Sequence, residues 1–296
     1  MSNSIITDTW EVAGDVVAEW IEPHLPTIFS TYHTHMEMMS RPTVQAIVAA
    51  AQIKPGFDVL DIGCGSGIPT LALAQLVGSA GSVTATDPSP VLIAAVTENV
   101  RQLGLTNVEI VQTNAAKLPF EPASFDAATC QFGAMFFPEV NVALTRIRAT
   151  LKTGGRAAFA AWGPIAENTL FNIFDKALVP YLPPPAPPEA DAQTVPESDL
   201  LTPMRFAQTG SLSAVLLNAG FDDVQEETHT VDLVWPDSPA GMVKFWFELS
   251  GIGQKLPPDR LDALSADLQA GYGKFVDGDS IRLSAAIVIA SGRQVA

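Results

Sequence analysis

The sequence is poor in cysteine, and this shortage excludes two common kinds of site. Cys64 and Cys130 are the only two cysteines in 296 residues. Two thiols by themselves are too few for a disulfide framework or a four-ligand zinc site. We therefore expect a reducing compartment, no disulfide framework and no metal centre.

Long apolar runs and positive charge are also scarce. No stretch approaches the roughly 20 apolar residues of a membrane span, and the first residues, MSNSIITDTWEV, lack the basic-then-apolar order of a signal peptide. We expect a cytoplasmic protein without a membrane span. Sixteen basic residues against 32 acidic ones give a net charge of −16, which repels a phosphate backbone, so we expect no nucleic-acid partner. What remains is a chain with 47% hydrophobic residues, enough for a substantial core.

An apolar run that ends in Asp61 and breaks into three alternating glycines is the feature around which the chain is organised. The segment VLDIGCGSGIPTLA predicts a strand, a tight turn and a helix. Gly63, Gly65 and Gly67 can take positive φ and carry no Cβ, so a ligand can lie against the turn and the helix N-terminus. A dinucleotide turn needs glycine where Ile68 stands, and a P-loop needs lysine after its last glycine. Neither phosphate motif fits; close strand–helix packing alone is the alternative.

A second predicted strand, Ser82–Asp87, also ends in an acid. Asp87 lies 22 residues beyond Gly65, close to the offset of about 20 at which a Rossmann-type unit presents a carboxylate to ribose hydroxyls. Strands alternate with helices along this region, which predicts βαβ units and a parallel sheet in an α/β fold. The other predicted strands are 108–112, 125–132, 156–162, 224–234 and 281–290, and the predicted helices are 70–77, 90–103, 141–151, 212–219, 241–249 and 261–269.

The regions outside this core predict a cap. Apolar stripes over 10–21 and 27–39 predict helices laid over an apolar surface, and a third helix is predicted to begin near Pro42. Seven prolines within 183–203 predict a semi-rigid surface loop or lid. We therefore expect three regions: an N-terminal helical cap (1–45), a Rossmann-like core (46–163), and the remainder of the sheet with lid insertions (164–296).

Five segments together resemble class I S-adenosylmethionine (SAM)-dependent methyltransferases, in the branch of the ubiquinone/menaquinone-biosynthesis C-methyltransferases (methyltransferase type 11). They are VLDIGCGSGIPTLALA, VTATDPSP, NVEIVQTNAAKLPFEPASFDAATCQFGAMFF, LKTGGRAAFAAW and LLNAGFDDV. The resemblance implies a seven-stranded, mostly parallel Rossmann-like sheet of order 3-2-1-4-5-7-6, with the last strand antiparallel and helices on both faces. It also implies SAM as cofactor, bound at the carboxyl ends of the strands. The resemblance does not specify the methyl acceptor.

The same resemblance assigns cofactor-binding roles to individual residues. It implies that Asp61, Gly63 and Gly65 meet the methionine part of SAM, and that Asp87 meets the ribose hydroxyls. The residues that would flank the adenine are Pro88 and Ser89.

The remaining cofactor positions follow the third and fourth strands. The family often has aspartate before alanine at the adenine amino group, whereas this chain has Asn114-Ala115. An asparagine carbonyl can still accept that hydrogen bond, without the strength that a charge adds. Gln131 and Phe132 fall where family members line the methyl-donor pocket, and a backbone cap is the other interpretation of Gln131.

Histidines near the N-terminus are the candidate catalytic residues. Methyl transfer from a sulfonium mainly needs alignment and exclusion of water, and it needs a base only where the acceptor atom holds a proton. His33 and His35 are the candidate bases, because imidazole suits proton abstraction near neutral pH. On a helix, His35 would share a face with Tyr32 and Met39, so a packing role is the alternative for both histidines.

The variable segments indicate the kind of acceptor. They are rich in aromatic residues, which favours an apolar or aromatic small molecule. We expect methylation at carbon, oxygen or nitrogen, with S-adenosylhomocysteine (SAH) as product, in a monomer or homodimer. The alternatives are a SAM-binding sensor or scaffold without turnover and a nucleotide-cofactor oxidoreductase.

Overall fold

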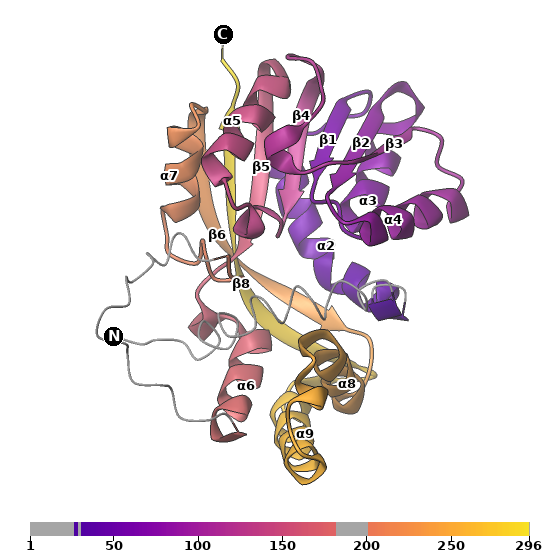
Figure 1. The fold of residues 1–296 in the computed structure, drawn as a ribbon, viewed down its shortest axis with the longest axis vertical. Helices are drawn as coiled ribbons and strands as arrows, with labels where there is room; N and C mark the ends of the chain where they lie inside the picture. Colours follow the sequence, from indigo (N-terminus) through magenta and orange to yellow (C-terminus); the bar gives the residue numbers. More distant parts are fainter. Residues whose placement is uncertain (1–26, 29–30, 182–200, 296) are drawn as a thin grey trace.

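The computed structural model describes residues 27–28, 31–181 and 201–295 and has a twisted β-sheet at its centre (Figure 1). No helix among these residues is long and apolar enough to cross a lipid bilayer. The strands are β1 (Asp58–Ile62), β2 (Ser82–Asp87), β3 (Val108–Gln112), β4 (Phe125–Gln131), β5 (Leu151–Trp162), β6 (Asp222–Trp235), β7 (Val276–Asp277) and β8 (Ser280–Arg293).

The sheet has the topology that the sequence predicts. Its order is β3-β2-β1-β4-β5-β8-β6, and the two-residue β7 adds an eighth strand beside β8. β1 to β5 are parallel, whereas β8 is antiparallel to both β5 and β6. The α/β class, the order of the seven longer strands and the antiparallel last strand are thus confirmed.

Helices cover both faces of the sheet. Strand side chains alternate between faces, so Leu60 packs in the core formed with α5 and α7, whereas Val59 packs in the core formed with α2 and α3. The helices are α2 (His33–Ala50), α3 (Ile68–Val77), α4 (Pro90–Gln102), α5 (Val140–Thr150), α6 (Thr169–Leu178), α7 (Ser211–Asn218), α8 (Pro239–Ser250) and α9 (Pro258–Gly273).

A ribbon of β6 and β8 extends past the other strands and carries a second core. Trp162, the last residue of β5, pairs with Ile287. Because β8 is antiparallel, its residues 280–286 lie beyond the carboxyl end of β5 and pair only with β6 and β7. Helices α6, α8 and α9 bury their apolar faces around this ribbon (Figure 1). From here on, the cap means this ribbon and these three helices, and not the N-terminal helical cap predicted over 1–45. It stands at the sheet edge where the parallel strands end.

The first described helix differs from the prediction. α2 runs continuously from His33 to Ala50 through Pro42, where the sequence predicts a new helix. Thr43, Val44 and Ile47 are buried, and this packing offsets the hydrogen bond that Pro42 cannot donate. The expected boundary at residue 45 falls inside α2. The predicted helix over 10–21 lies outside the described residues.

Two further predictions need correction after β4. α5 ends at Thr150 and β5 begins at once, whereas the sequence predicts a helix stopped by Gly154-Gly155. These glycines lie in β5 where its register with β4 shifts, and a Cβ on Gly155 would lie 2.9 Å from the carbonyl oxygen of Asp126. α6 is absent from the predicted helices, although its buried apolar residues repeat at helical spacing: Leu170, Phe171, Phe174 and Leu178. Most of the proline-rich segment lies outside the described residues.

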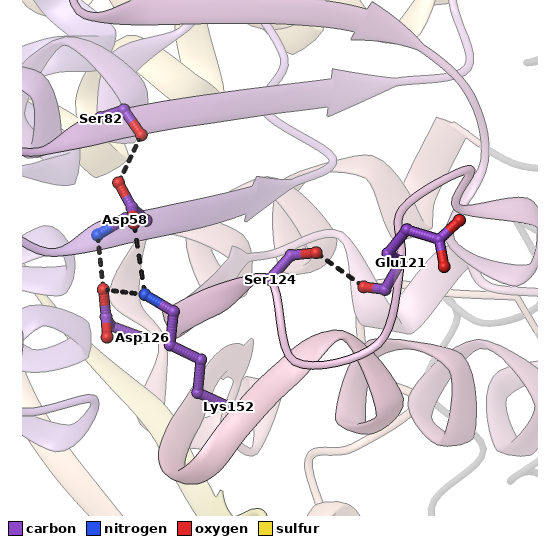
Figure 2. A network of polar contacts seen from close by, with 6 residues as sticks. All are labelled: Asp58, Ser82, Glu121, Ser124, Asp126 and Lys152. Carbon is purple, nitrogen blue, oxygen red and sulfur yellow. Dashed lines mark hydrogen bonds and ion pairs between the residues drawn. The ribbon is translucent and has the colours of Figure 1, made fainter.

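Charged side chains join the strands at the amino end of the sheet (Figure 2), which is the end opposite the cap (Figure 1). Lys152 Nζ lies 3.3 Å from Asp58 Oδ2 and 3.0 Å from Asp126 Oδ2. Asp126 Oδ2 also accepts a hydrogen bond from the backbone N–H of Asp58 at 2.9 Å, and Ser82 Oγ donates to Asp58 Oδ1 at 2.8 Å. Lys152 thereby offsets the repulsion between two neighbouring carboxylates, and Asp126 makes the largest contribution to raising the pKa of Lys152.

Replacing Lys152 with methionine should lower the free energy of unfolding by less than about 1 kcal/mol, because the three side chains are partly exposed. The pKa of Lys152 is raised in the folded state, so its charge stabilises the fold fully at pH values below the ordinary lysine pKa of 10.5. This contribution is lost as the pH rises through the pKa of the folded state. The difference should shrink at high salt. Urea unfolding at two salt concentrations measures it, with Lys54→Met at an exposed position as control. Equal free energies of unfolding for wild type and Lys152→Met at low salt would show that Lys152 does not stabilise this edge of the sheet.

Candidate functional site

The glycine turn after β1 adopts the left-handed conformation at all three glycines. The φ angles are +65° at Gly63, +56° at Gly65 and +93° at Gly67, a region that side chains other than glycine avoid. A Cβ on Gly67 would lie 2.5 Å from the side chain of Val96, so this glycine serves close packing of α3 against α4. The space around Gly65 is open to 4 Å. The turn therefore combines packing at its third glycine with room for a ligand at its second.

Asp87, at the end of β2, holds this turn. Its Oδ2 accepts a hydrogen bond from the N–H of Gly65 at 3.0 Å, and its Oδ1 accepts one from the N–H of Ser89 at 2.9 Å. Burial raises the pKa of Asp87, and the two N–H groups oppose that rise. Each carboxylate oxygen offers two lone pairs, so each retains one for a further donor. This geometry fits two ribose hydroxyls.

Asp61 lies beneath the turn rather than at its surface. Only 1% of the residue is exposed. Thr70 Oγ1 donates to Asp61 Oδ2 at 2.6 Å, and Thr129 Oγ1 donates to Oδ1 at 2.9 Å. Burial raises the pKa of Asp61 to about 6 against the effect of these two hydroxyls. Asp61 thus has almost no surface for direct contact with a ligand.

The two threonines that hold Asp61 are missing from the predicted site. Thr70 stands in the first turn of α3 and Thr129 near the end of β4, and both are buried. The signal that could have found them is a hydroxyl side chain inside an apolar run next to a strand end. The pairing of Thr129 with Asp61 depends on β1 lying beside β4, which local sequence does not show.

The predicted adenine-binding residues lie at the ends of β2 and β3. Asn114 is exposed and precedes the short helix Ala115–Lys117, in which Ala115 is buried. Pro88 is exposed, and its carbonyl accepts a hydrogen bond from Gln112 Nε2 at 3.2 Å. These two loops are therefore adjacent at the edge that also holds Asp87.

Gln131 ends β4 at the same edge. Its Oε1 is buried and has no hydrogen-bond partner among the described residues. An unsatisfied buried acceptor costs roughly 1–3 kcal/mol, which a donor from a ligand would offset. The loops after β1 and β4 touch, since a Cβ on Gly63 would lie 3.6 Å from the Cα of Gly133. Gln131 therefore belongs with the glycine turn, and the alternative of a backbone cap through Oε1 has no partner in the described part of the chain.

The two candidate bases lie on the first turn of α2, on the cap side. The ring centroid of His35 is 4.5 Å from that of Trp235 and 5.5 Å from that of Tyr32, and its Nε2 is 3.9 Å from Asp237 Oδ2. The predicted proximity of His35 to Tyr32 is confirmed. Nδ1 of both His33 and His35 is buried without a hydrogen-bond partner in the described ranges. The structure thus groups the cofactor candidates on the sheet side and the histidines on the cap side.

The two cysteines are buried, free thiols. Burial raises the pKa of both, that of Cys130 to about 12, so each stays protonated at neutral pH. A protonated buried thiol is a packing group rather than a nucleophile. Within residues 27–28, 31–181 and 201–295, no group of three or more His, Cys, Asp or Glu side chains is placed to hold a metal ion.

Comparison with known proteins relates this chain to methyltransferases. Residues 59–155 match a family model described as a methyltransferase domain. The chain is 27% identical over 258 residues to nocamycin O-methyltransferase from Saccharothrix syringae, covering 86% of this chain and 91% of that protein. It is 39% identical over 104 residues to a demethylmenaquinone methyltransferase from Bacillus cytotoxicus, covering 35% of this chain and 44% of that protein. The solved structure of the YcgJ protein from Bacillus subtilis shares the fold, with a TM-score of 0.55 and 17% identity over 86% of this chain and 99% of that one.

Proposed function

Given that this chain is a class I SAM-dependent methyltransferase, we propose that it methylates a small apolar or aromatic molecule at carbon, oxygen or nitrogen. The proposal rests mainly on one observation: the glycine turn and the aromatic cap lie at the same edge of the sheet. The acid-tipped strands β1 and β2 with their glycine turn end there, and the aromatic cap stands over that edge. Relatives named for nocamycin and demethylmenaquinone agree with a small-molecule acceptor.

Residues on the sheet side fit the cofactor. SAM, when bound, supplies a methyl group activated on a sulfonium. The glycine turn, which is open at Gly65, lies against its methionine part, and Asp87 accepts from its ribose hydroxyls through the two free lone pairs. Asn114 accepts from the adenine amino group. The buried negative charge of Asp61 beneath the turn favours a cationic ligand over a neutral one.

The acceptor binds on the cap side. Its nucleophilic atom forms a bond to the methyl carbon while the carbon–sulfur bond breaks and sulfur keeps the electron pair, which leaves SAH. An acceptor atom that carries a proton loses it to a base, and His33 and His35 are the candidates because each has a free, buried Nδ1 within the described residues. The cap's aromatic side chains exclude water from this step. Cytoplasmic location and a monomeric or dimeric state stay predictions.

Incubation with methyl-labelled SAM and a panel of quinols, phenols and amines tests methyl transfer. We expect label in at least one quinol or phenol, with one SAH formed per methyl group transferred. The matched control is the same panel with labelled SAM and the Asp87→Ala variant. Tight binding of SAM with no label in any acceptor would favour the sensor or scaffold instead.

A further inference from the structure

Two aromatic rings stack where neighbouring strands end. Phe132 directly follows β4, and Trp162 is the last residue of β5. Their ring centroids are 4.1 Å apart with an angle of 8° between the planes. Both side chains are half-buried, whereas Phe171, the next ring beyond Trp162, is buried. The stack is therefore the more exposed part of this aromatic array.

The backbone holds Phe132 in a conformation that bulky residues avoid. Its φ is +55°, in the left-handed region. Its N–H donates to the carbonyl of Ala160 at 2.9 Å, and the next residue must be small because a Cβ on Gly133 would lie 2.9 Å from Cys130 Sγ. Strain of this kind persists only where surrounding structure fixes it, and it gathers at functional sites.

The loop after Trp162 is equally fixed. Asn168 is fully buried, and its Nδ2 donates to the carbonyls of Gly163 at 2.9 Å and Pro164 at 3.0 Å. On the cap side, Trp162 meets Phe171 edge-on at 4.9 Å between centroids. Backbone hydrogen bonds thus fix the positions of both rings, and the cap backs Trp162.

The Phe132–Trp162 stack lies beside the glycine turn and beside a hydrogen-bond acceptor that has no partner among the described residues. Gln131 precedes Phe132, and its buried Oε1 lacks a partner among the described residues. Gly133 follows Phe132 and touches the turn at Gly63. One apolar plane and one hydrogen-bond acceptor therefore stand together beside the turn.

We infer that the Phe132–Trp162 stack is the platform for a planar, hydroxylated ring of the methyl acceptor, and that Gln131 Oε1 accepts a hydrogen bond from that hydroxyl. The inference rests on the proposed function and narrows its acceptor to a phenol or quinol. Parallel aromatic faces favour a flat ring over a puckered one of the same size. An unpaired buried carbonyl favours a ligand that brings a donor.

Calorimetry on the SAH-bound protein tests the platform, because SAH supports no transfer. The probes are 2-naphthol and its saturated, puckered analogue decahydro-2-naphthol. We expect the wild type to prefer 2-naphthol, and Phe132→Leu and Trp162→Leu to bind it roughly tenfold more weakly with the saturated alcohol little changed. Leucine keeps the Cβ at position 132, so the backbone strain is the same in variant and wild type.

Two further variants separate the platform from general packing. Phe174→Leu removes a buried cap ring outside the stack and should keep the preference for 2-naphthol. Phe132→Tyr keeps an aromatic ring in the stack and should also keep the preference for 2-naphthol. This variant keeps the inference testable if a leucine variant fails to fold. Gln131→Leu should lower the affinity for 2-naphthol several-fold and leave the affinity for naphthalene, which has no hydroxyl, unchanged.

The outcomes distinguish this inference from the function on which it rests. A wild type that binds SAH but shows no preference between the two alcohols overturns the platform, while methyl transfer to another acceptor would still stand. A second contradicting result is that Phe132 variants bind SAM more weakly than wild type while binding SAH equally well. That result would show that the ring contacts the sulfonium charge, and it would also overturn the platform. A protein that binds neither SAM nor SAH overturns the proposed function itself.

Discussion

Asp87→Ala should weaken SAM binding by more than tenfold. The substitution removes the two carboxylate oxygens that we propose accept from the ribose hydroxyls, and hydrogen bonds to charged groups contribute about 1.5–3 kcal/mol each. It also releases the N–H groups of Gly65 and Ser89, which Asp87 now holds at 3.0 and 2.9 Å. Calorimetric titration of the variant with SAM measures the loss.

A matched substitution separates ligand contact from general damage to the sheet. Asp126→Ala removes a carboxylate at the opposite, amino edge of the sheet and should leave SAM affinity within about twofold of wild type. Asp87→Asn keeps the shape and one acceptor oxygen, so its affinity should lie between wild type and the alanine variant. An unchanged affinity in Asp87→Ala would remove this residue from the ribose site.

Asp61→Asn should stabilise the ligand-free protein at neutral pH and weaken SAM binding. The pKa of Asp61 is raised from 3.8 to about 6, chiefly by burial. The folded state therefore takes up this proton more readily than the unfolded state, and the stabilisation that protonation gives is present below pH 3.8 and lost as the pH rises through 6. Ionised Asp61 then costs on the order of 3 kcal/mol. Asparagine avoids that cost and loses the charge that favours a cation.

Urea unfolding of wild type and Asp61→Asn without ligand measures this effect. The variant should exceed wild type by up to about 3 kcal/mol near neutral pH, and the difference should fade on acidification below pH 6. SAM affinity of the wild type should fall over the same acidic interval, because the cation favours the ionised carboxylate. A variant that is less stable than wild type at neutral pH, together with SAM affinity independent of pH, would contradict this role.

The parts of the fold that depend on contiguous residues are predictable from sequence. The glycine turn, the acids at the ends of β1 and β2, and the strand segments each lie within a few residues of their own signal. The order of the strands follows from the family resemblance rather than from local pattern. The predicted alternation of strands and helices and the ligand-binding edge at their carboxyl ends then place Asp87 beside Gly65, as the structure has it.

The features that sequence does not predict depend on contacts between distant segments. α2 continues through Pro42 because Thr43, Val44 and Ile47 bury against the rest of the fold, which local helix rules do not weigh. Asp61 is predicted from its motif to meet the methionine part of SAM, and the structure buries its carboxylate against Thr129 of the neighbouring strand β4 as well as against the nearby Thr70.

A bulky residue in the left-handed region gives no signal in sequence either. The φ of +55° at Phe132 is imposed by its hydrogen bond to Ala160 and by its tightly packed neighbour Gly133. The stacking of Phe132 on Trp162 likewise requires β4 and β5 to be adjacent. The proposed acceptor side of the site is therefore the side that sequence predicts least.

Separate calorimetric titrations of the wild-type protein with SAM and with NAD test the central claim most directly. If the glycine turn and Asp87 hold the nucleoside of SAM, then SAM binds at one site per chain, SAH competes with it, and NAD gives no binding heat. Binding of NAD without binding of SAM would contradict the account.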